Sequence, residues 1–471
     1  MTDSVSGAAT PDNGQPTRQH WKWTVLASMA SYIDAGTIVA GASGLVLWQT
    51  MFGMSELTVG LLTALGANAL SCALGALIGG RLGDLLGRKR IYAYDLLFYA
   101  FGALFIIFAQ NVPMLFIGFI ITGLAVGADV PTSLSLVGEF SPGKSRGKLI
   151  GLTQVAWSVG PVIVLLLALV LSPLGVLGIR IVFAHLFVVA LVTWYLRRGM
   201  VESARWTAAS GAGGGARTGA ASEQPATAGV PSNPLALSRA RDLFSGPNLK
   251  ALLFTGSIYL LWNIPAGSHG QFLPYILQTA GAQSQASSVA LQCLYFGLVL
   301  VGVLAVFMRL ADTRFRRPMF IVGAVMQVFA FAAFVFFPLT LATGLANVIL
   351  FGLGQAVAGE AFYKLWSQEM FPTMLRGTAQ GITWATARTF LGFWSILVPL
   401  LLVSESGLAT MSLVLMVCLA LFGLIGAVFM PDTAGKSLEE IEAERGFAGT
   451  PSAAAKAAAN PVERPSGKAK G

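Results

Sequence analysis

Apolar runs of about twenty residues recur along nearly the whole chain, and this repetition limits the possible folds more than any other feature. A helix of about this length crosses a hydrocarbon core about 30 Å thick. A strand barrel would instead show alternating segments of about ten residues, a pattern that the sequence does not have. The mean hydropathy of +0.71 also excludes an ordinary soluble domain. We therefore expect an all-α membrane protein.

The apolar runs predict twelve spans in two groups of six. Their expected ranges are 24–49, 57–80, 91–110, 113–139, 148–171, 175–197, 249–278, 287–309, 318–338, 341–366, 377–403 and 409–430. The low-complexity stretch GAGGGARTGAASEQPATAGVPSNP separates the groups and has the composition of a flexible linker. The predicted organisation is a disordered N-terminus (1–23), a six-helix bundle (24–198), a partly disordered linker (199–248), a second bundle (249–430) and a tail (431–471). The polar first twenty residues argue against a cleavable signal peptide.

Positive charge alternates between the connections of these spans. The connections after spans two, four, six and eight carry Arg81, Arg88, Lys89, Arg90, Lys144, Arg146, Lys148, Arg197, Arg198, Arg205, Arg309, Arg314, Arg316 and Arg317. The odd-numbered connections carry neither Lys nor Arg. By the positive-inside rule, both termini and the linker face the cytoplasm. We expect the protein to lie in the cell (inner) membrane. Topology thus accounts for the net charge of +9, and we expect no nucleic-acid partner.

The two groups of six spans contain an internal repeat. RLGD at 81–84, followed by Arg88, matches RLAD at 309–312, followed by Arg316, at an offset of 228 residues. An E-x-x-P-x-x-x-R-G pattern begins at Glu139 and again at Glu369, at an offset of 230. Collinear matches at nearly one offset indicate a duplicated six-helix unit. Parallel halves of this kind place a ligand site between them, near the middle of the membrane.

Several motifs resemble a known family. GGRLGDLLGRKR is similar to the signature of the major facilitator superfamily, and EFSPGKSRG, VESARW, QEMFPTMLRG and PDTAGKSLEEIE are similar to sugar porter motifs. The resemblance covers residues 24–445 and implies the major facilitator fold and a secondary transporter that works by alternating access, in this branch usually with protons. It also implies a cytoplasmic gate. The expected gate residues are Asp84, Arg88, Glu139, Arg146, Asp312, Arg316, Glu369 and Arg376.

Two acids inside spans are candidates for proton coupling. Placing a charge at these depths costs about 2.5–3.5 kcal/mol on insertion scales, so an acid found there is expected to have a function. Asp34 lies in span one with no basic residue in the same helix, in a context similar to that of the sugar porter coupling acid. Its alternative is a carboxylate at a helix break. Asp129 lies in span four, two residues before Pro131. The family usually places an arginine in span four to pair with the span-one acid, whereas this chain has Phe119 there.

Spans five and seven supply candidate groups for solute binding. Gln154 stands where sugar porters keep a sugar-binding glutamine, and Trp157 follows on the same helix face. Packing of the span is the alternative for both. Span seven, with its prolines and glycines, predicts a broken helix, which favours a site. From it we select Asn263 and Gln271, whereas His269 is better interpreted as neutral and hydrogen bonded.

Spans ten and eleven carry charges that the sugar porters generally lack. Glu360 and Lys364 lie four residues apart on one helix face, and span eleven adds Trp384 and Arg388. Either Glu360 neutralises both cations within its own half, or these groups line the cavity, with Glu360 a third candidate for proton coupling. The run GEAFYKLWSQEMFPTMLRGTAQG is similar to bacterial inositol transporters.

These observations favour proton-coupled symport of a small polyhydroxy solute, with myo-inositol as the leading candidate. The alternative is a symporter or exchanger of a small organic anion such as an aromatic acid, followed by a multidrug exporter; a receptor that does not transport remains open. The sequence contains no H-E-x-x-H, G-x-S-x-G or P-loop motif, so we expect no enzyme activity. Three scattered cysteines predict no disulfide framework or metal site, and we expect no cofactor. The partners are the solute, protons and the bilayer, with the monomer as the functional unit.

Overall fold

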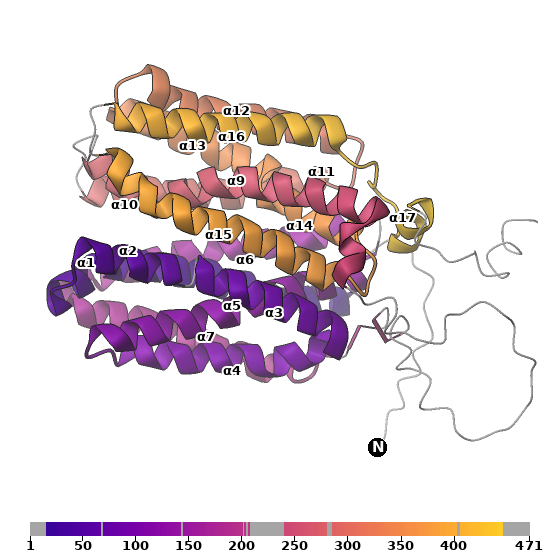
Figure 1. Ribbon diagram of the computed structural model, residues 1–471, viewed down its shortest axis with the longest axis horizontal. Helices are drawn as coiled ribbons and strands as arrows, with labels where there is room; N and C mark the ends of the chain where they lie inside the picture. Colours follow the sequence, from indigo (N-terminus) through magenta and orange to yellow (C-terminus); the bar gives the residue numbers. More distant parts are fainter. Residues whose placement is uncertain are drawn as a thin grey trace, which may run out of the picture.

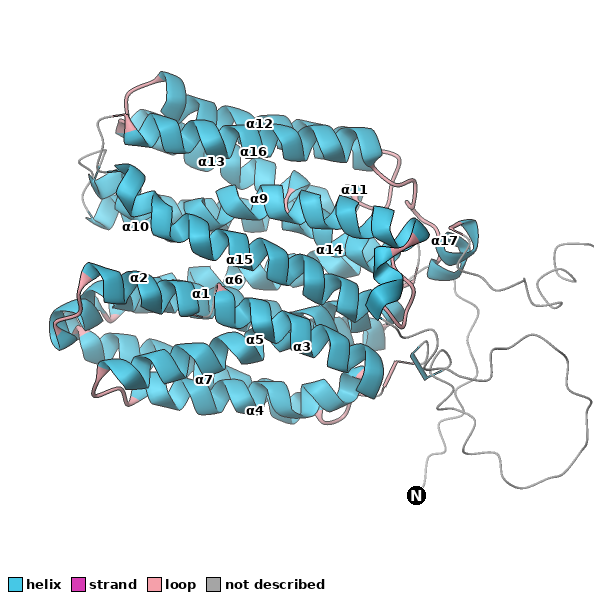
Figure 2. Cartoon of the chain, in the orientation of Figure 1, coloured by secondary structure: helices cyan, strands magenta, loops and turns pink. Residues whose placement is uncertain are grey.

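The computed structural model describes residues 16–66, 69–142, 145–200, 202–203, 206–207, 240–279, 285–402 and 406–445. Residues 1–15, the low-complexity linker, the tail beyond residue 445, and Lys144 and Arg205 lie outside the described residues. Within the described part, every regular element is helical (Figure 2). The first half of the chain forms one bundle and the second half packs beside it (Figure 1).

The first bundle contains six of the expected spans. Its helices are α1 (Arg18–Phe52), α2 (Glu56–Leu65), α3 (Leu70–Leu86), α4 (Arg88–Ile107), α5 (Val112–Phe140), α6 (Arg146–Val170) and α7 (Val176–Arg197), with the short 3-10 turn η2 (Ser172–Leu174) before α7. Thr17 begins α1 by accepting a hydrogen bond from the backbone N–H of His20. Span two is divided into α2, which ends at Leu65, and α3, which begins at Leu70.

The second bundle contains the other six. Its elements are η5 (Ala240–Phe244), α9 (Gly246–Thr279), α10 (Gln285–Gly302), the π-helical turn η6 (Val303–Phe307), α11 (Met308–Leu310), α12 (Arg316–Phe336), α13 (Leu341–Ala358), α14 (Glu360–Glu369), α15 (Arg376–Leu402) and α16 (Gly407–Phe429). Beyond α16, the short helix α17 (Leu438–Glu444) lies against one end of the bundle (Figure 1).

The break in the second bundle lies in a different span from the one expected. Span seven was predicted to be broken, but α9 runs as one helix through Pro265 and its glycines. A proline removes one backbone donor, and helices packed in a membrane tolerate this loss. Span ten is broken instead: at Gly359 the backbone turns to φ −110° and ψ −140°, which ends α13 and starts α14 in a new direction.

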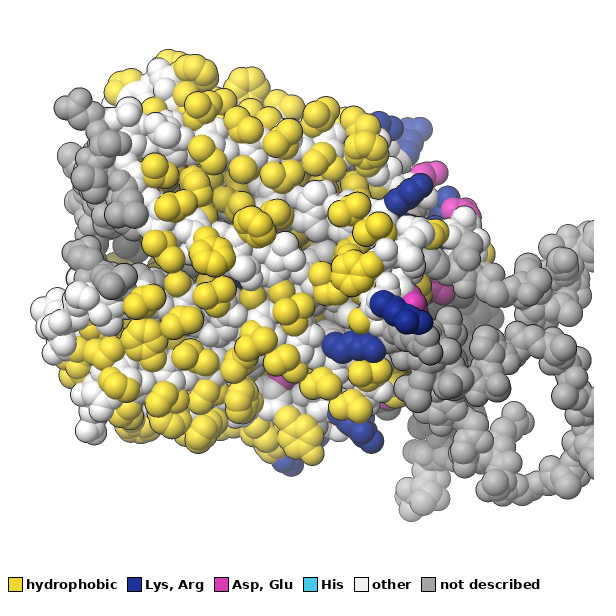
Figure 3. Space-filling model, in the orientation of Figure 1, with side chains coloured by type: hydrophobic (Ala, Val, Ile, Leu, Met, Phe, Trp, Pro, Cys, Tyr) yellow, Lys and Arg dark blue, Asp and Glu magenta, His cyan; other side chains and the backbone are white. Residues whose placement is uncertain are grey.

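The outer surface is apolar, and positive charge gathers at one end of the molecule (Figure 3). Large side chains such as Phe101 and Phe393 are more than half exposed. Among the described residues, ten helices are long and apolar enough to cross a membrane. We call the end that carries Arg88, Arg146 and Arg316 the basic end.

Candidate functional site

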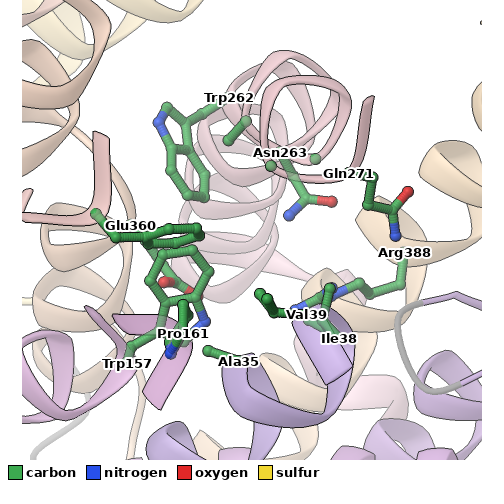
Figure 4. Close-up of a pocket in the computed structure, with 14 residues that line it drawn as sticks. Ala35, Ile38, Val39, Trp157, Pro161, Trp262, Asn263, Gln271, Glu360 and Arg388 are labelled. Atoms are coloured by element: carbon green, nitrogen blue, oxygen red, sulfur yellow. The ribbon is translucent and has the colours of Figure 1, made fainter. Parts of the chain in front are cut away.

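A cavity of about 470 Å³ lies between the two bundles (Figure 4). Helices α1, α6, α9, α10, α14 and α15 line it with Ala35, Ile38, Val39, Trp157, Pro161, Trp262, Asn263, Ala266, Gly267, Gly270, Gln271, Phe296, Glu360 and Arg388. Five residues singled out in the sequence therefore meet here: Trp157, Asn263, Gln271, Glu360 and Arg388. They come from both halves, as expected for a site between duplicated units.

Several polar atoms at this site have no hydrogen-bond partner among the described residues. They include Oδ1 of Asn263 at the cavity and Nε2 of Gln154 beside it. Buried polar groups are normally paired, and leaving one unpaired costs about 1–3 kcal/mol. A ligand with several hydroxyl groups can both donate to and accept from groups of this kind.

The first charge contact at the cavity joins the two halves. Oδ2 of Asp34 on α1 lies 3.7 Å from Nη2 of Arg388 on α15, and both side chains are buried. Phe119, which stands where sugar porters usually have an arginine, instead packs edge-on against Trp48 and Phe183. The cation beside Asp34 thus comes from the opposite half of the chain.

The second charge contact lies within the second half, and a hydrogen bond joins it to the first half. Nζ of Lys364 on α14 lies 3.3 Å from Oε2 of Glu360 and donates to Oε1 of Gln154 on α6 at 3.0 Å. The break at Gly359 sets the direction of α14 and so brings Glu360 to the cavity wall. Gln154 and Lys364 do not line the cavity themselves. They lie beside it, because Lys364 contacts the lining residue Glu360 and Gln154 contacts Lys364. Arg388 reaches Asp34, so the interpretation in which Glu360 alone neutralises both cations is wrong.

A stack of aromatic rings supports the wall on the side of the second half. The ring of Tyr259 lies 4.0 Å from that of Tyr363 and 4.8 Å from that of Trp384, centroid to centroid. Trp384 is buried behind the wall and does not line the cavity. The sequence analysis did not select Tyr259 or Tyr363, because single tyrosines in apolar runs carry no pattern that distinguishes them from packing residues.

A second cavity of about 550 Å³ adjoins the first on the side away from the basic end. Ile38 and Gln271 line both cavities. Thr37, Gly41 and Phe119 also line the second cavity.

At the basic end, two matching aspartates each bind the first turn of a helix in the opposite half. Asp84 accepts hydrogen bonds from the backbone N–H groups of Gly377 and Thr378 at the start of α15. Asp312 accepts from Gly147 and Lys148 at the start of α6. A helix N-terminus favours a carboxylate, because its N–H groups are unpaired and its dipole is positive there.

Two matching glutamates complete the closure of this end. Glu139 pairs with Arg88 of its own half at 2.7 Å and with Arg376 of the other half at 3.3 Å. Glu369 pairs with Arg316 of its own half at 3.2 Å and with Arg146 of the other half at 3.4 Å. The structure thus brings together all eight residues expected at a gate, and it does so with the symmetry of the sequence repeat.

Asp129 does not lie at the cavity. Its carboxylate pairs with Arg197 at 3.0 Å and accepts a hydrogen bond from Ser133, inside the first bundle. Asp95 of α4, which the sequence analysis missed, lies 3.6 Å from the same guanidinium. His269 hydrogen bonds to Asn347 and does not line the cavity, in agreement with its structural interpretation. Within the described residues, there is no group of three or more His, Cys, Asp or Glu side chains placed to hold a metal.

Comparison with known proteins decides the family. A family model described as "Sugar (and other) transporter" matches residues 21–444. The chain belongs to this family. The minor myo-inositol transporter IolF of Bacillus subtilis is 40% identical over 425 residues, which are 90% of this chain and 93% of the relative. The major myo-inositol transporter IolT of the same organism is 27% identical over 431 residues, or 83% and 86% of the two chains.

Solved structures support the fold of this sugar transporter. The proton:xylose symporter XylE, bound to 6-bromo-6-deoxy-D-glucose, superposes with a TM-score of 0.73 at 19% identity, over 90% of this chain and 98% of that one. An inward-open structure of XylE from E. coli superposes with a TM-score of 0.60. The predicted major facilitator fold, an all-α membrane protein with twelve spans, is therefore confirmed. As a member of a transporter family, the chain is a multi-pass membrane protein.

Proposed function

We propose that this sugar transporter carries a small polyhydroxy solute together with protons by alternating access, with myo-inositol as the best candidate. The observation that carries the proposal is the cavity between the halves, where amide, indole and carboxylate groups lie beside an ion pair that joins the two bundles. Similarity to IolF supports the choice of solute. We place the chain in the cell inner membrane, with the basic end and both termini in the cytoplasm.

The solute would bind between Trp157 of the first half and Asn263 and Gln271 of the second. An amide can accept from one hydroxyl and donate to another, and an indole ring offers an apolar face for the C–H side of a ring. Glu360 adds a charged acceptor at the same wall. A solute held from both halves favours the arrangement in which the halves are close together, which is the requirement for a transported substrate.

Protons would act through Asp34. While Asp34 is ionised, it attracts the buried guanidinium of Arg388 in the other half, and separating the two halves costs the loss of this attraction. A proton on Asp34 removes one of the two charges and so lowers this cost. Protonation would thus allow the halves to separate at the cavity, which links proton uptake to the change of access.

The eight charged residues at the basic end would form the cytoplasmic gate. Four backbone hydrogen bonds to Asp84 and Asp312, together with the crossed pairs of Glu139 and Glu369, hold the halves closed there. The second cavity extends from the first toward the opposite end. The structure would therefore correspond to a state with the cytoplasmic side closed. We propose that the monomer suffices for this cycle.

Transport of an organic anion is less well supported. A carboxylate ligand needs a cation in excess, whereas Arg388 and Lys364 each lie near an acid, Asp34 and Glu360, so that the formal charges of the four groups cancel. Asp129 is paired with Arg197 away from the cavity and cannot add a polar group to the site. We therefore propose the polyol over the anion.

Uptake into proteoliposomes tests the function. The purified chain is reconstituted, and uptake of labelled myo-inositol, hexoses and an aromatic acid is measured with and without an imposed proton gradient. We expect myo-inositol to accumulate when the inside is alkaline and not when the gradient is collapsed by an ionophore. Accumulation of the acid, with neither uptake of polyols nor competition by them, would overturn the proposal.

A further inference from the structure

Three charged side chains form a second buried cluster in the first bundle, apart from the cavity. Asp95 of α4, Asp129 of α5 and Arg197 of α7 are each at most 6% exposed. Nη1 of Arg197 lies 3.0 Å from Oδ2 of Asp129 and 3.6 Å from Oδ2 of Asp95. Tyr92 places its ring 4.4 Å from the guanidinium and adds no charge of its own at neutral pH.

The formal charges of this cluster do not balance. Two carboxylates and one guanidinium leave one negative charge in a site closed to water. The helix packed on the remaining side, α1, contributes the backbone carbonyls of Leu26 and Ala27, which accept from Arg197 at 3.0 and 3.3 Å. Carbonyl oxygens cannot compensate a negative charge. An uncompensated buried charge costs several kcal/mol, and a buried acid avoids this cost by keeping its proton.

The hydrogen bonding of Asp95 points to the same conclusion. Its Oδ1 accepts from the backbone N–H of Leu96, but its Oδ2 has no hydrogen-bond donor among the described residues. Oδ2 of Asp95 and Oδ2 of Asp129 both face the same nitrogen of Arg197, so the neighbouring side chain is a second carboxyl, which is itself an acceptor when ionised. Ser133 already donates to Asp129 at 2.5 Å. A proton between the two acids supplies the missing donor, as in carboxyl pairs that cannot both ionise.

We propose that Asp95 and Asp129 form a second proton-binding site, in which the two carboxyl groups share one proton beside Arg197. The site shares no residue with the cavity and does not include Asp34. Its position gives it a mechanical connection to the cavity, because Arg197 holds α1 at Leu26 and Ala27, about two turns before Asp34 on the same helix.

Infrared spectroscopy of the full-length protein in liposomes tests the proposal. At neutral pH we expect a carbonyl stretch from a protonated carboxyl group, which shifts when H₂O is replaced by D₂O. Asp95→Asn and Asp129→Asn should each remove the same band, because either change leaves one carboxylate neutralised by Arg197. Asp432→Asn, at a side chain that is 95% exposed, is the matched control and should keep the band.

Three outcomes would overturn the proposal. Absence of the band in the unchanged protein would show that both acids are ionised, whatever the variants do. Loss of the band in only one of the two variants would place the proton on an isolated carboxyl. A thermal stability that rises with Na⁺ in place of choline, and no longer does so in Asp95→Asn, would show that a metal cation balances the charge. We expect the Na⁺ and choline melting temperatures to agree.

Discussion

At the scale of single residues, the cation beside Asp34 comes from a different helix than in the family pattern. The arginine that sugar porters usually carry in span four is Phe119 here, and its ring fills an apolar space beside Trp48. Arg388 of α15 supplies the cation for Asp34 instead. If the pair acts in coupling, it couples the two halves directly, because each half contributes one partner.

Replacement of Asp34 tests that role. Asp34→Asn keeps the size of the side chain but cannot gain or lose a proton. We expect gradient-driven accumulation of myo-inositol in proteoliposomes to fall to the level reached without a gradient, while exchange of labelled for unlabelled solute continues. Asp242→Asn, in η5 at the basic end, is the control and should accumulate normally. Undiminished accumulation by Asp34→Asn would remove this residue from the coupling role.

The indole of Trp157 offers a test of solute recognition. Trp157→Phe keeps an aromatic face but removes the N–H group from the cavity wall. Loss of one hydrogen bond to the solute, about 0.5–1.5 kcal/mol, should raise the KM for uptake by roughly two- to tenfold. Trp394→Phe removes an indole that donates to Ser268 outside the cavity, and its KM should not change. Equal KM values for both variants would contradict a contact between Trp157 and the solute.

At the scale of helices, glycines decide how closely neighbours approach. A Cβ added to Gly79 would lie 2.3 Å from Cα of Ala128 on α5, in the same bundle. A Cβ added to the next residue, Gly80, would lie 2.2 Å from the carbonyl oxygen of Gly377 on α15, in the other bundle. Two adjacent residues of α3 therefore serve two different interfaces, one within a half and one between the halves.

This difference predicts distinct effects of two similar substitutions. Gly80→Ala should separate α3 from α15 and so favour opening of the basic end, measured as faster labelling of cysteines introduced there. Gly79→Ala should instead disturb packing inside the first bundle and lower the melting temperature, as overpacking by about 1–3 kcal/mol does. The same labelling rate and the same melting temperature in both variants would contradict the assignment of the two interfaces.

At the scale of the whole molecule, closure at the basic end repeats the duplication of the sequence. Each half contributes one aspartate that binds the first turn of a helix in the other half, and one glutamate that pairs with an arginine of the other half. Rotation of the halves away from each other would break both sets together. Such a crossed arrangement makes closure cooperative, because the contacts share the same rigid bodies.

The pH dependence of closure can be predicted from Asp312, which lies outside the spans. Burial raises the pKa of Asp312 from 3.8 to about 6, although hydrogen bonding by Gly147 and the charge of Arg316 act in the opposite direction. In the open state the carboxyl would be hydrated, with a pKa near its ordinary value. The closed state therefore binds the proton more tightly, so closure should strengthen as the pH falls from about 6 toward 4 and weaken as it rises through about 6.

Labelling of a cysteine introduced at the basic end, measured between pH 5 and 8, checks this expectation. The midpoint of the change is predicted to about one pH unit. Because a thiol reacts as its thiolate, each rate is divided by that of the same cysteine in the denatured protein at the same pH. This ratio should be lower at pH 5 than at pH 8, with much of the change near pH 6. Asp312→Asn should reduce the change, because the amide does not titrate. A profile that is the same in Asp312→Asn and in the unchanged protein would assign the dependence to other groups.

The spans, their number and the duplicated unit could be predicted from the sequence, because they depend on the length of apolar runs, on the placement of charge and on local repetition. The charged residues that meet at the basic end could also be predicted, because they recur at fixed spacing in the two halves and lie in motifs that resemble those of the family. The break in span ten could not: Gly359 is one of 54 glycines, and nothing local distinguishes it from those inside continuous helices such as α9.

The partners of the buried charges depended on the tertiary structure. Asp34 and Asp129 look alike in the sequence, as single acids in apolar helices, yet one lies beside Arg388 at the cavity and the other beside Arg197 in the bundle interior. Which cation a buried acid meets depends on how each helix is rotated and on how the halves are docked. Those angles arise from packing between segments far apart in the chain, so no local pattern records them.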